Sequence, residues 1–229
     1  MTRDTKVHCR VLWQEGSSAM HIPDGMLSPQ VWVPLAGASA VAVGLAARKA
    51  REQLEEKQIP VAGVLGAFVF AAQMINFPVL AGTTGHLVGA ALVTVLLGPW
   101  LAILVMSCVL IAQCLVFQDG GLTALGANIF NMALLGCAVT AVVQRAARGL
   151  VGGYRGDVAA GVVGAWLAVF LGAIACALEL VASGRFPLRE SLIAMGGVHA
   201  IIGAFEGTIT AVALAYILAV RPDVAAART

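Results

Sequence analysis

The chain has 229 residues, of which 60% are hydrophobic and 11% are charged, and its mean hydropathy is +0.91. A soluble domain of this composition would expose large apolar patches, so these values exclude that class and indicate a membrane protein. The formal net charge of +2 gives no reason to expect a nucleic-acid partner. The sequence also lacks a phosphate-binding G-x-x-x-x-G-K-S/T loop, so any ATP that drives it must be hydrolysed by another subunit.

The first nineteen residues do not fit the pattern of the remaining chain. They contain no signal-peptide apolar core, because polar residues interrupt the run 7–13. We expect residues 1–19 to be a non-native or removed extension, through initiation at Met20 or cleavage after Ala19. Retention of the tail is the alternative. Residues 20–229 are then expected to form a single transmembrane domain.

The segment Met20-His21-Ile22-Pro23-Asp24-Gly25 precedes the first long apolar run. If Met20 is the first residue, its free amine, the His21 backbone nitrogen and the His21 imidazole can close two fused chelate rings on one metal ion. Such a planar set of nitrogen ligands suits Ni(II), Cu(II) or Co(II). Pro23 stiffens the segment and has no competing N–H. The turn that includes Asp24 can fold the terminus back onto the bundle.

Seven apolar segments follow, and a helix needs about 20 such residues to cross the hydrocarbon core. They cover approximately residues 30–47, 60–77, 84–98, 99–117, 122–144, 157–183 and 194–220. The sequence therefore predicts an all-α polytopic membrane protein with about seven transmembrane helices. The third segment is short and interrupted by glycine, which favours backbone that lines a cavity. Pro99 predicts a tight hairpin into the fourth.

Basic residues are distributed unevenly between the connecting segments. The side with more of them holds Arg48, Lys49, Arg51, Lys57, Arg145, Arg148, Arg155, Arg221 and Arg228. Beyond the extension, the opposite side holds Arg185 and Arg189. By the positive-inside rule, the first side is cytoplasmic. We therefore expect the amino terminus outside and the carboxyl terminus in the cytoplasm.

Several polar side chains interrupt the apolar segments and are functional candidates, because ionisable groups in a membrane are costly. They share positions inside the expected spans or at their outer ends: Gln73, Asn76, His86, Asp119, Glu179, His199 and Glu206. His86 is the best-placed imidazole to complete the nitrogen set. His199 and Glu206 are two helical turns apart and face the same way. Hydrogen bonding between helices is nevertheless the simpler interpretation for all of these residues except His86 and Asp119. Asp119 is most simply a helix cap.

Several long motifs, in this order, resemble one family. They are M-H-I-P-D-G-x-L at 20–27, Q-M-I-N-F-P at 73–78, G-T-T-G-H-L-x-G at 82–89, F-Q-D-G-G-L-T-A-L-G-A-N-x-F-N-M at 117–132 and H-A-x-I-G-x-x-E at 199–206. These motifs resemble those of the substrate-binding subunits of nickel and cobalt energy-coupling-factor (ECF) transporters, the NikM/CbiM family. The resemblance covers about 20–220, which is essentially the whole membrane part.

The resemblance implies a seven-helix fold in which the amino terminus is tucked into the bundle. It implies a metal-binding domain whose ligands are the amine of Met20, the amide and imidazole of His21, and His86. Weaker candidates, expected to support these ligands, are Asp24, Gln73, Asn76, Asp119, His199 and Glu206. Such a subunit is not an enzyme. It works with a transmembrane coupling (T) subunit, a pair of cytoplasmic ATPases and a small accessory membrane subunit.

The motif M-H-I-P-D-G favours the nickel branch of this family, with cobalt uptake for cobalamin synthesis as the alternative. Two other classes compete. An ion-coupled secondary transporter could use His199, Glu206 and Glu179 as a proton relay, but we find no internal repeat of the kind common in such carriers. An intramembrane metalloenzyme would need a three-ligand site, and the chain has no H-E-x-x-H motif.

Overall fold

The fold is described by a computed structural model for residues 20–75, 77–78 and 84–221. Within these ranges the chain forms seven helical segments and one pair of two-residue strands. The helical segments are α2 (Pro29–Gln53), α3 (Gln58–Met74), α4 (Ala90–Leu97), α5 (Pro99–Ala112) continued by η1 (Gln113–Phe117), α6 (Leu125–Asn128) continued by η2 (Ile129–Leu135) and α7 (Gly136–Leu150), α8 (Gly153–Ala182) and α9 (Leu188–Val220). The predicted all-α polytopic fold is confirmed.

Five of these segments are long and apolar enough to cross a membrane: α2, α5 with η1, the continuous α6–η2–α7 rod, α8 and α9. Helix α3 is apolar but has 17 residues. Large apolar side chains are exposed on the outer faces of the helices, among them Val41, Val64, Phe68, Val142 and Phe205. Such a surface suits a lipid environment, since in a bilayer it faces hydrocarbon rather than water. The chain is a multi-pass membrane protein.

The third helical segment is shorter than the sequence predicted and begins later. Residues 84–85 form strand β2 (Thr84–Gly85), which pairs antiparallel with β1 (Phe77–Pro78). The chain then stays extended until Gly89, whose φ of 78° is in the left-handed region, and α4 begins at Ala90. The expected start at residue 84 is therefore wrong. Glycine adopts this conformation without steric cost and so breaks the helix there.

Helix α4 lies inside the bundle rather than across it. All eight of its residues are buried, and at the usual rise it is about 12 Å long, too short to span the hydrocarbon core. It ends at Gly98, which is also the N-cap of α5, and Pro99 occupies the first turn of α5. The predicted tight hairpin is confirmed. Short helices surrounded by protein are tolerated at membrane depth because lipid does not reach their ends.

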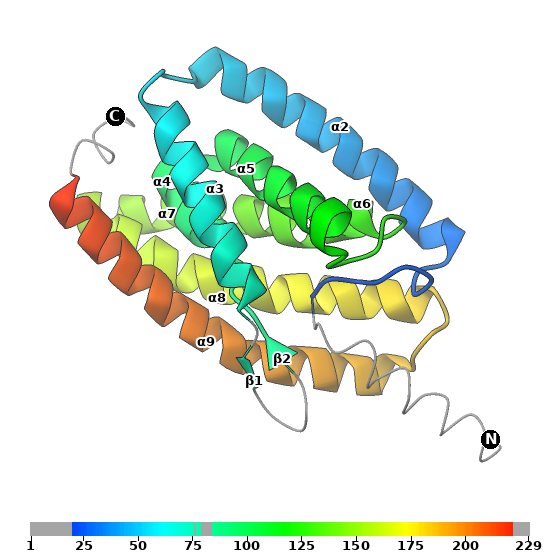
Figure 1. Cartoon of the computed structure of the whole chain (residues 1–229). Helices are drawn as coiled ribbons and strands as arrows, with labels where there is room; N and C mark the ends of the chain where they lie inside the picture. Colours follow the sequence, from blue (N-terminus) through cyan, green and yellow to red (C-terminus); the bar gives the residue numbers. More distant parts are fainter. Residues whose placement is uncertain (1–19, 76, 79–83, 222–229) are drawn as a thin grey trace.

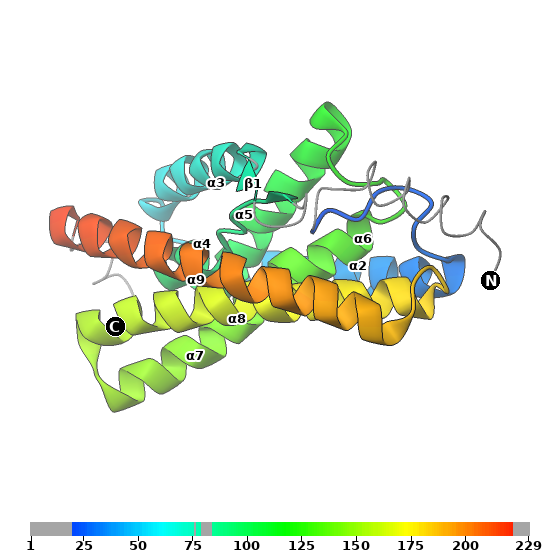
Figure 2. The ribbon, with the colours of Figure 1, turned by 90° about the horizontal axis from the view of Figure 1, so that it is seen from below.

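The connections of the bundle lie at two opposite ends. At the left-hand end in Figure 1 are the α2–α3 connection, the α7–α8 connection and the end of α9; at the other end are the segment before α2 and the α8–α9 connection. Figure 2 shows α3 and α7 on opposite sides of α8 and α9. Two π-helical stretches, η1 and η2, interrupt the rods that surround the segment before α2.

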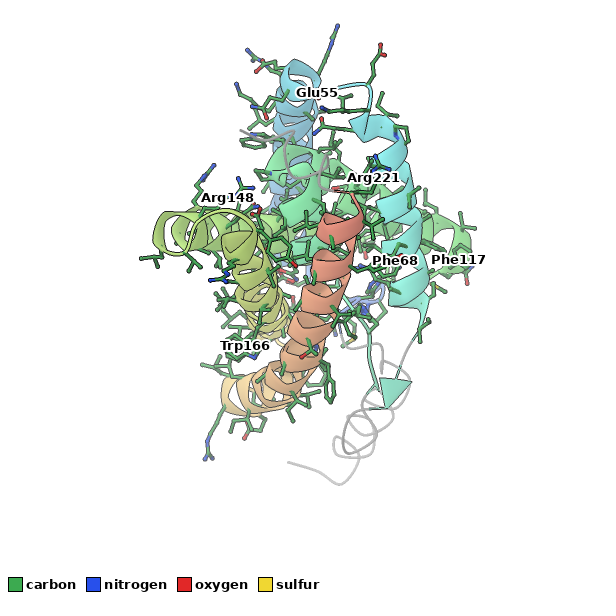
Figure 3. All side chains as sticks on the ribbon, turned by 90° about the vertical axis from the view of Figure 1, so that its left-hand side faces the viewer. Glu55, Phe68, Phe117, Arg148, Trp166 and Arg221 are labelled. Carbon is green, nitrogen blue, oxygen red and sulfur yellow. The ribbon has the colours of Figure 1, made fainter. Side chains whose placement is uncertain are left out.

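The described basic residues that were expected on one side do share one end of the bundle, and Arg228 lies outside the described residues. Figure 3 views this end directly, with Glu55 labelled in the α2–α3 connection, Arg148 near the end of α7 and Arg221 just after α9. Arg185 lies in the α8–α9 connection at the opposite end. The charge asymmetry therefore follows the fold, as the positive-inside rule requires. Which end faces the cytoplasm stays a prediction.

Candidate metal site

The segment before α2 enters the bundle instead of running over its surface. Met20, His21 and Ile22 are only 2–3% exposed, whereas the Pro23-Asp24-Gly25 turn that follows is exposed. The methyl group of Met20 lies against Gly172 of α8. A chain end that is buried to this degree needs partners for its backbone polar groups, because buried N–H and C=O groups are otherwise costly. We call residues 20–28 the terminal segment.

Asn128, at the end of α6, makes hydrogen bonds with both the N–H and the carbonyl of Ile22. The Ile22 N–H donates to Asn128 Oδ1 at 2.9 Å, and Asn128 Nδ2 donates to the Ile22 carbonyl at 3.2 Å. The same carbonyl accepts a second hydrogen bond from the Gly121 N–H at 2.9 Å. Asn128 is 2% exposed. One amide side chain therefore binds the terminal segment through its main chain.

Asp24 fixes the next part of the terminal segment to the turn before α6. Its carboxylate accepts hydrogen bonds from the N–H of Leu122, at 3.0 Å, and from the N–H and hydroxyl of Thr123. These bonds, chiefly that from the Thr123 hydroxyl, lower the pKa of Asp24 below its ordinary value. Helix α6 itself has no side-chain cap, so the capping role that was the simpler interpretation of Asp119 is not seen there. The N–H groups of the turn before α6 are instead bound by Asp24, 98 residues or more away in the sequence.

The α8–α9 connection holds the terminal segment from the other side. The guanidinium of Arg185 donates to the carbonyls of Gly25, at 2.6 Å, and Met26, at 3.0 Å. The Ser28 N–H donates to the hydroxyl of Ser183 at 3.0 Å. Partners from α6, from the turn before it and from the α8–α9 connection therefore define the position of the segment.

Two glycines let the terminal segment approach the turn that follows η1. Gly120 has a φ of 91°, and a Cβ there would lie 2.9 Å from Asn128 Nδ2 and 3.6 Å from His21 Nδ1. A Cβ on Gly121 would overlap the backbone of Asp24, 2.7 Å from its Cα. The Asp-Gly-Gly sequence is a turn, as its composition suggests, and its two glycines also leave the space that the terminal segment occupies.

The imidazoles of His21 and His86 meet inside the bundle. Their ring centroids are 4.9 Å apart, and the ring planes cross at 80°. Both residues are buried, at 2% and 4% exposure. His21 Nδ1 lies 3.3 Å from the Asp119 carbonyl oxygen and 3.5 Å from its carboxylate, and His86 Nδ1 lies 3.0 Å from the Leu87 carbonyl oxygen. The predicted convergence of the terminal segment, His86 and Asp119 is therefore observed.

A carbonyl oxygen accepts and never donates, so each of these Nδ1 atoms carries the proton and each Nε2 carries a lone pair. The Nε2 atoms of His21 and His86 are buried, and neither has a hydrogen-bond partner in the described part of the chain. Neutral imidazoles whose second nitrogen is held by a carbonyl are the form in which histidine binds metals. Burial also lowers the pKa of His21, against the opposing effect of the Asp119 carboxylate, which keeps this imidazole neutral near pH 7.

His199, on α9, is a third imidazole whose Nδ1 bonds a carbonyl and whose Nε2 has a free lone pair. Its Nδ1 bonds the Met195 carbonyl one turn back, at 2.8 Å, and its buried Nε2 has no partner among the described residues. It lies close enough to His86 for the two rings to interact electrostatically. Even so, no three His, Cys, Asp or Glu side chains in the described ranges come together as a metal-binding group. Backbone nitrogens would have to complete a coordination sphere here.

Glu206 and Gln73 hold the segment between β2 and α4, which carries His86, rather than the imidazole itself. The Glu206 carboxylate accepts the N–H groups of Val88, at 2.7 Å, and Gly89, at 2.9 Å, and Gln73 Nε2 donates to the Val88 carbonyl at 2.6 Å. Both side chains are 1% exposed. A carboxylate that accepts the first N–H groups before α4 also complements the positive end of that helix. These two candidates are therefore positioning residues.

The remaining candidates lie elsewhere. Glu179, on α8, accepts a hydrogen bond from Asn131 Nδ2 at 2.9 Å. Asn76 lies outside the described residues. Asn128 and Arg185 were not singled out in the sequence, although an asparagine within an apolar segment is as unusual as the ionisable groups that were. The motif L-G-A-N at 125–128 was the available signal.

Comparison with known proteins places these features in a family. Residues 21–224 match the CbiM model, described as a cobalt uptake substrate-specific transmembrane region. The chain is 42% identical over 207 residues to a protein of Archaeoglobus fulgidus named as a putative fused nickel transport protein, NikMN. The aligned region covers 90% of this chain and 68% of that protein. It is 35% identical over 217 residues to the cobalt transport protein CbiM of Sorangium cellulosum, covering 90% and 94% of the two chains.

A solved structure gives the same result for the fold. The crystal structure of a truncated transition metal transporter matches with a TM-score of 0.79 at 33% identity, covering 87% of this chain and 98% of that one.

Proposed function

The chain belongs to the CbiM family of metal-uptake transmembrane components, and from this premise we propose that it captures Ni(II) for an ATP-driven ECF-type importer. As a nickel or cobalt uptake component it has no catalytic step of its own. ATP hydrolysis falls to a pair of cytoplasmic ATPases, joined to this chain by a transmembrane coupling subunit and accompanied by a small accessory membrane subunit.

The ion is held by four nitrogens: the amine of Met20, the backbone nitrogen and imidazole of His21, and the imidazole of His86. The observation that carries this proposal is the buried contact of His21 with His86, whose ring centroids are 4.9 Å apart. It requires that residues 1–19 are absent from the mature protein, since in a longer chain the Met20 nitrogen is an amide and the terminal amine ligand does not exist. Met20 is buried together with its neighbour His21, so a terminal amine at this position would lie inside the bundle.

The proposed chelate requires that His21 binds the metal through Nδ1. A ring that contains the metal, the His21 amide nitrogen and its imidazole closes through Nδ1, the ring nitrogen nearer the backbone. Nδ1 now faces the Asp119 carbonyl. Rotating the imidazole by half a turn about χ2 frees Nδ1 for the metal and moves Nε2 to the position that Cε1 occupied, on the Asp119 side. Nε2–H can then donate to Asp119 in place of Nδ1–H. Asp119 thus supports the imidazole in both orientations and fixes the tautomer that the metal needs.

Four nitrogens in a plane favour Ni(II) over Co(II), and the relative named for nickel transport shares 42% of the aligned residues. Cobalt uptake by the same kind of importer is the second candidate, which the relative named CbiM favours. Copper binds such ligands more tightly still by the Irving–Williams order. Selection among these metals then rests on geometry and on what the cell supplies.

The test compares two purified forms of the protein, one beginning at Met20 and one retaining residues 1–19. Intact mass identifies the terminus, and Ni(II) binding is measured by titration calorimetry, with the absorption spectrum reporting planar coordination. We expect planar Ni(II) binding in the first form and its loss in the second, in His21→Ala and in His86→Ala. Equal affinity in the two forms would refute the terminal-amine site. Metal uptake in vesicles without any ATPase would refute the ATP-driven class.

A further inference from the structure

A cavity of about 300 Å³ lies at the end of the bundle opposite to the imidazole pair. It is bounded by the end of α2, the start of α3, the α4–α5 turn and α7. Its polar lining consists of Gln53, Gln58, Gln144, Arg145 and Arg148, with Trp100 beside them. This is the end of the bundle that Figure 3 faces, near the labelled Arg148. The proposed metal site does not use any of these residues.

The cavity carries positive charge. Among the described residues, no Asp or Glu lines it. Arg148 donates Nε and Nη2 to the carboxylate of buried Asp157, at 2.8 Å and 3.1 Å, and Gln144 Nε2 donates to it at 2.8 Å. This network neutralises Arg148 and fixes its guanidinium, but it leaves three of the five N–H donors unused. Arg145 has no ion pair in the described part of the chain, so one positive charge is uncompensated.

Nearby acidic side chains do not supply the missing charge. Glu52, at the end of α2, pairs with Arg48 and Lys49, and Glu55 pairs with Lys57. These pairs are exposed and lie outside the lining of the cavity. Glu56, in the same connection, is also exposed and lies outside the lining, so none of these carboxylates lines the cavity.

The start of α5 adds backbone donors to the same space. Gly98 caps this helix without a side-chain hydrogen bond, and Pro99 at its first position has no N–H. The N–H groups of Trp100 and Leu101 belong to the first turn, where a helix leaves its donors unpaired. Both residues line the cavity. The positive end of a 14-residue helix and two guanidinium groups thus share one cavity, a combination suited to phosphate oxygens.

We propose that this cavity binds the phosphodiester headgroup of an anionic phospholipid. The apolar surroundings favour a lipid over a soluble anion: Leu54, Leu97 and Leu101 line the cavity, and Leu150 and Val151 are exposed at the adjacent α7–α8 connection. Trp100 has the amphipathic ring that residues at a membrane interface commonly present. Basic pockets between transmembrane helices on the cytoplasmic side are where lipid headgroups bind. The proposal does not depend on the metal or on residues 1–19.

The test measures phospholipid binding by native mass spectrometry and thermal stability in nanodiscs of phosphatidylglycerol or phosphatidylcholine. Arg145→Gln removes the uncompensated charge and leaves the Asp157 network intact. Arg155→Gln is the matched control, because it removes a charge from the same end of the bundle but does not line the cavity. We expect wild type to favour phosphatidylglycerol, Arg145→Gln to bind it about fivefold more weakly, and Arg155→Gln to match wild type. Arg145→Glu should abolish the preference.

Four results would overturn the proposal. In the first, the two lipids bind equally. In the second, Arg145→Gln and Arg155→Gln behave alike. In the third, inorganic phosphate or glycerophosphate displaces phosphatidylglycerol at equal phosphate concentration, which would make the cavity a site for soluble anions. Absence of lipid from this site in the assembled transporter, with a partner's polypeptide in its place, would equally contradict it.

Discussion

Replacing Asn128 with alanine should weaken Ni(II) binding while the bundle stays folded. The side chain is 2% exposed and makes two hydrogen bonds with the backbone of Ile22. Without it the buried Ile22 N–H has no acceptor, which costs about 1–3 kcal/mol. The Ile22 carbonyl keeps its bond from Gly121, so the second lost hydrogen bond adds about 1 kcal/mol. The sum is about 2–4 kcal/mol.

This free energy is lost in the state that binds metal, because that state holds the terminal segment against α6. A change of about 2–4 kcal/mol corresponds to a decrease of about 30- to 850-fold in affinity. The assay is competition for Ni(II) with a chelating dye, using protein that begins at Met20, with thermal unfolding measured in parallel. Thr140→Val is the matched control, because Thr140 is fully buried and its hydroxyl bonds only within α7.

The control should bind Ni(II) like wild type. If Asn128→Ala also binds like wild type and remains folded, then the main-chain contacts of Ile22 do not position the ligands. The account of the terminal segment would then be wrong.

Three further predictions test other parts of the site. Gly121→Ala should abolish Ni(II) binding in calorimetry, because its Cβ would overlap the backbone of the terminal segment, whereas Gly63→Ala, at an open position, should not; equal effects would contradict the steric argument. Glu206→Gln places an amide donor against two backbone N–H groups and should lower Ni(II) affinity about tenfold or more, while Glu190→Gln in the exposed first turn of α9 should leave it unchanged. Ni(II) affinity should rise about a hundredfold per pH unit between about pH 6.5 and 7.5, because the terminal amine and one backbone amide each lose a proton on binding. The His21 imidazole adds no third proton, because burial lowers its pKa from 6.5 and it is already neutral in this pH range. An affinity that does not change with pH would exclude the amine as a ligand.

The sequence predicted the helical segments and the meeting of His21 with His86, because both follow from local patterns and known motifs. It did not predict where α4 begins. A glycine-rich apolar stretch is equally hydrophobic as a helix or as non-helical chain. The pairing of β2 with β1 and the buried Glu206 and Gln73, which bond the backbone of Val88 and Gly89, hold it in the non-helical form. The role of Asn128 was missed for a related reason. Its partner is 106 residues away, and hydropathy carries no information about such distances.

The terminal segment also fixes the order in which the molecule can be assembled. It is the first described part to be synthesised, yet its hydrogen bonds reach Ser183 and Arg185, 155 and 160 residues later. The segment between β2 and α4, which carries His86, depends on Glu206, 118 residues after Val88. Contacts of such sequence separation form late, since the intervening chain must first be ordered. A nascent chain therefore cannot form the proposed metal site until α8 and α9 have entered the membrane, and metal binding at that site would report completion of the whole bundle.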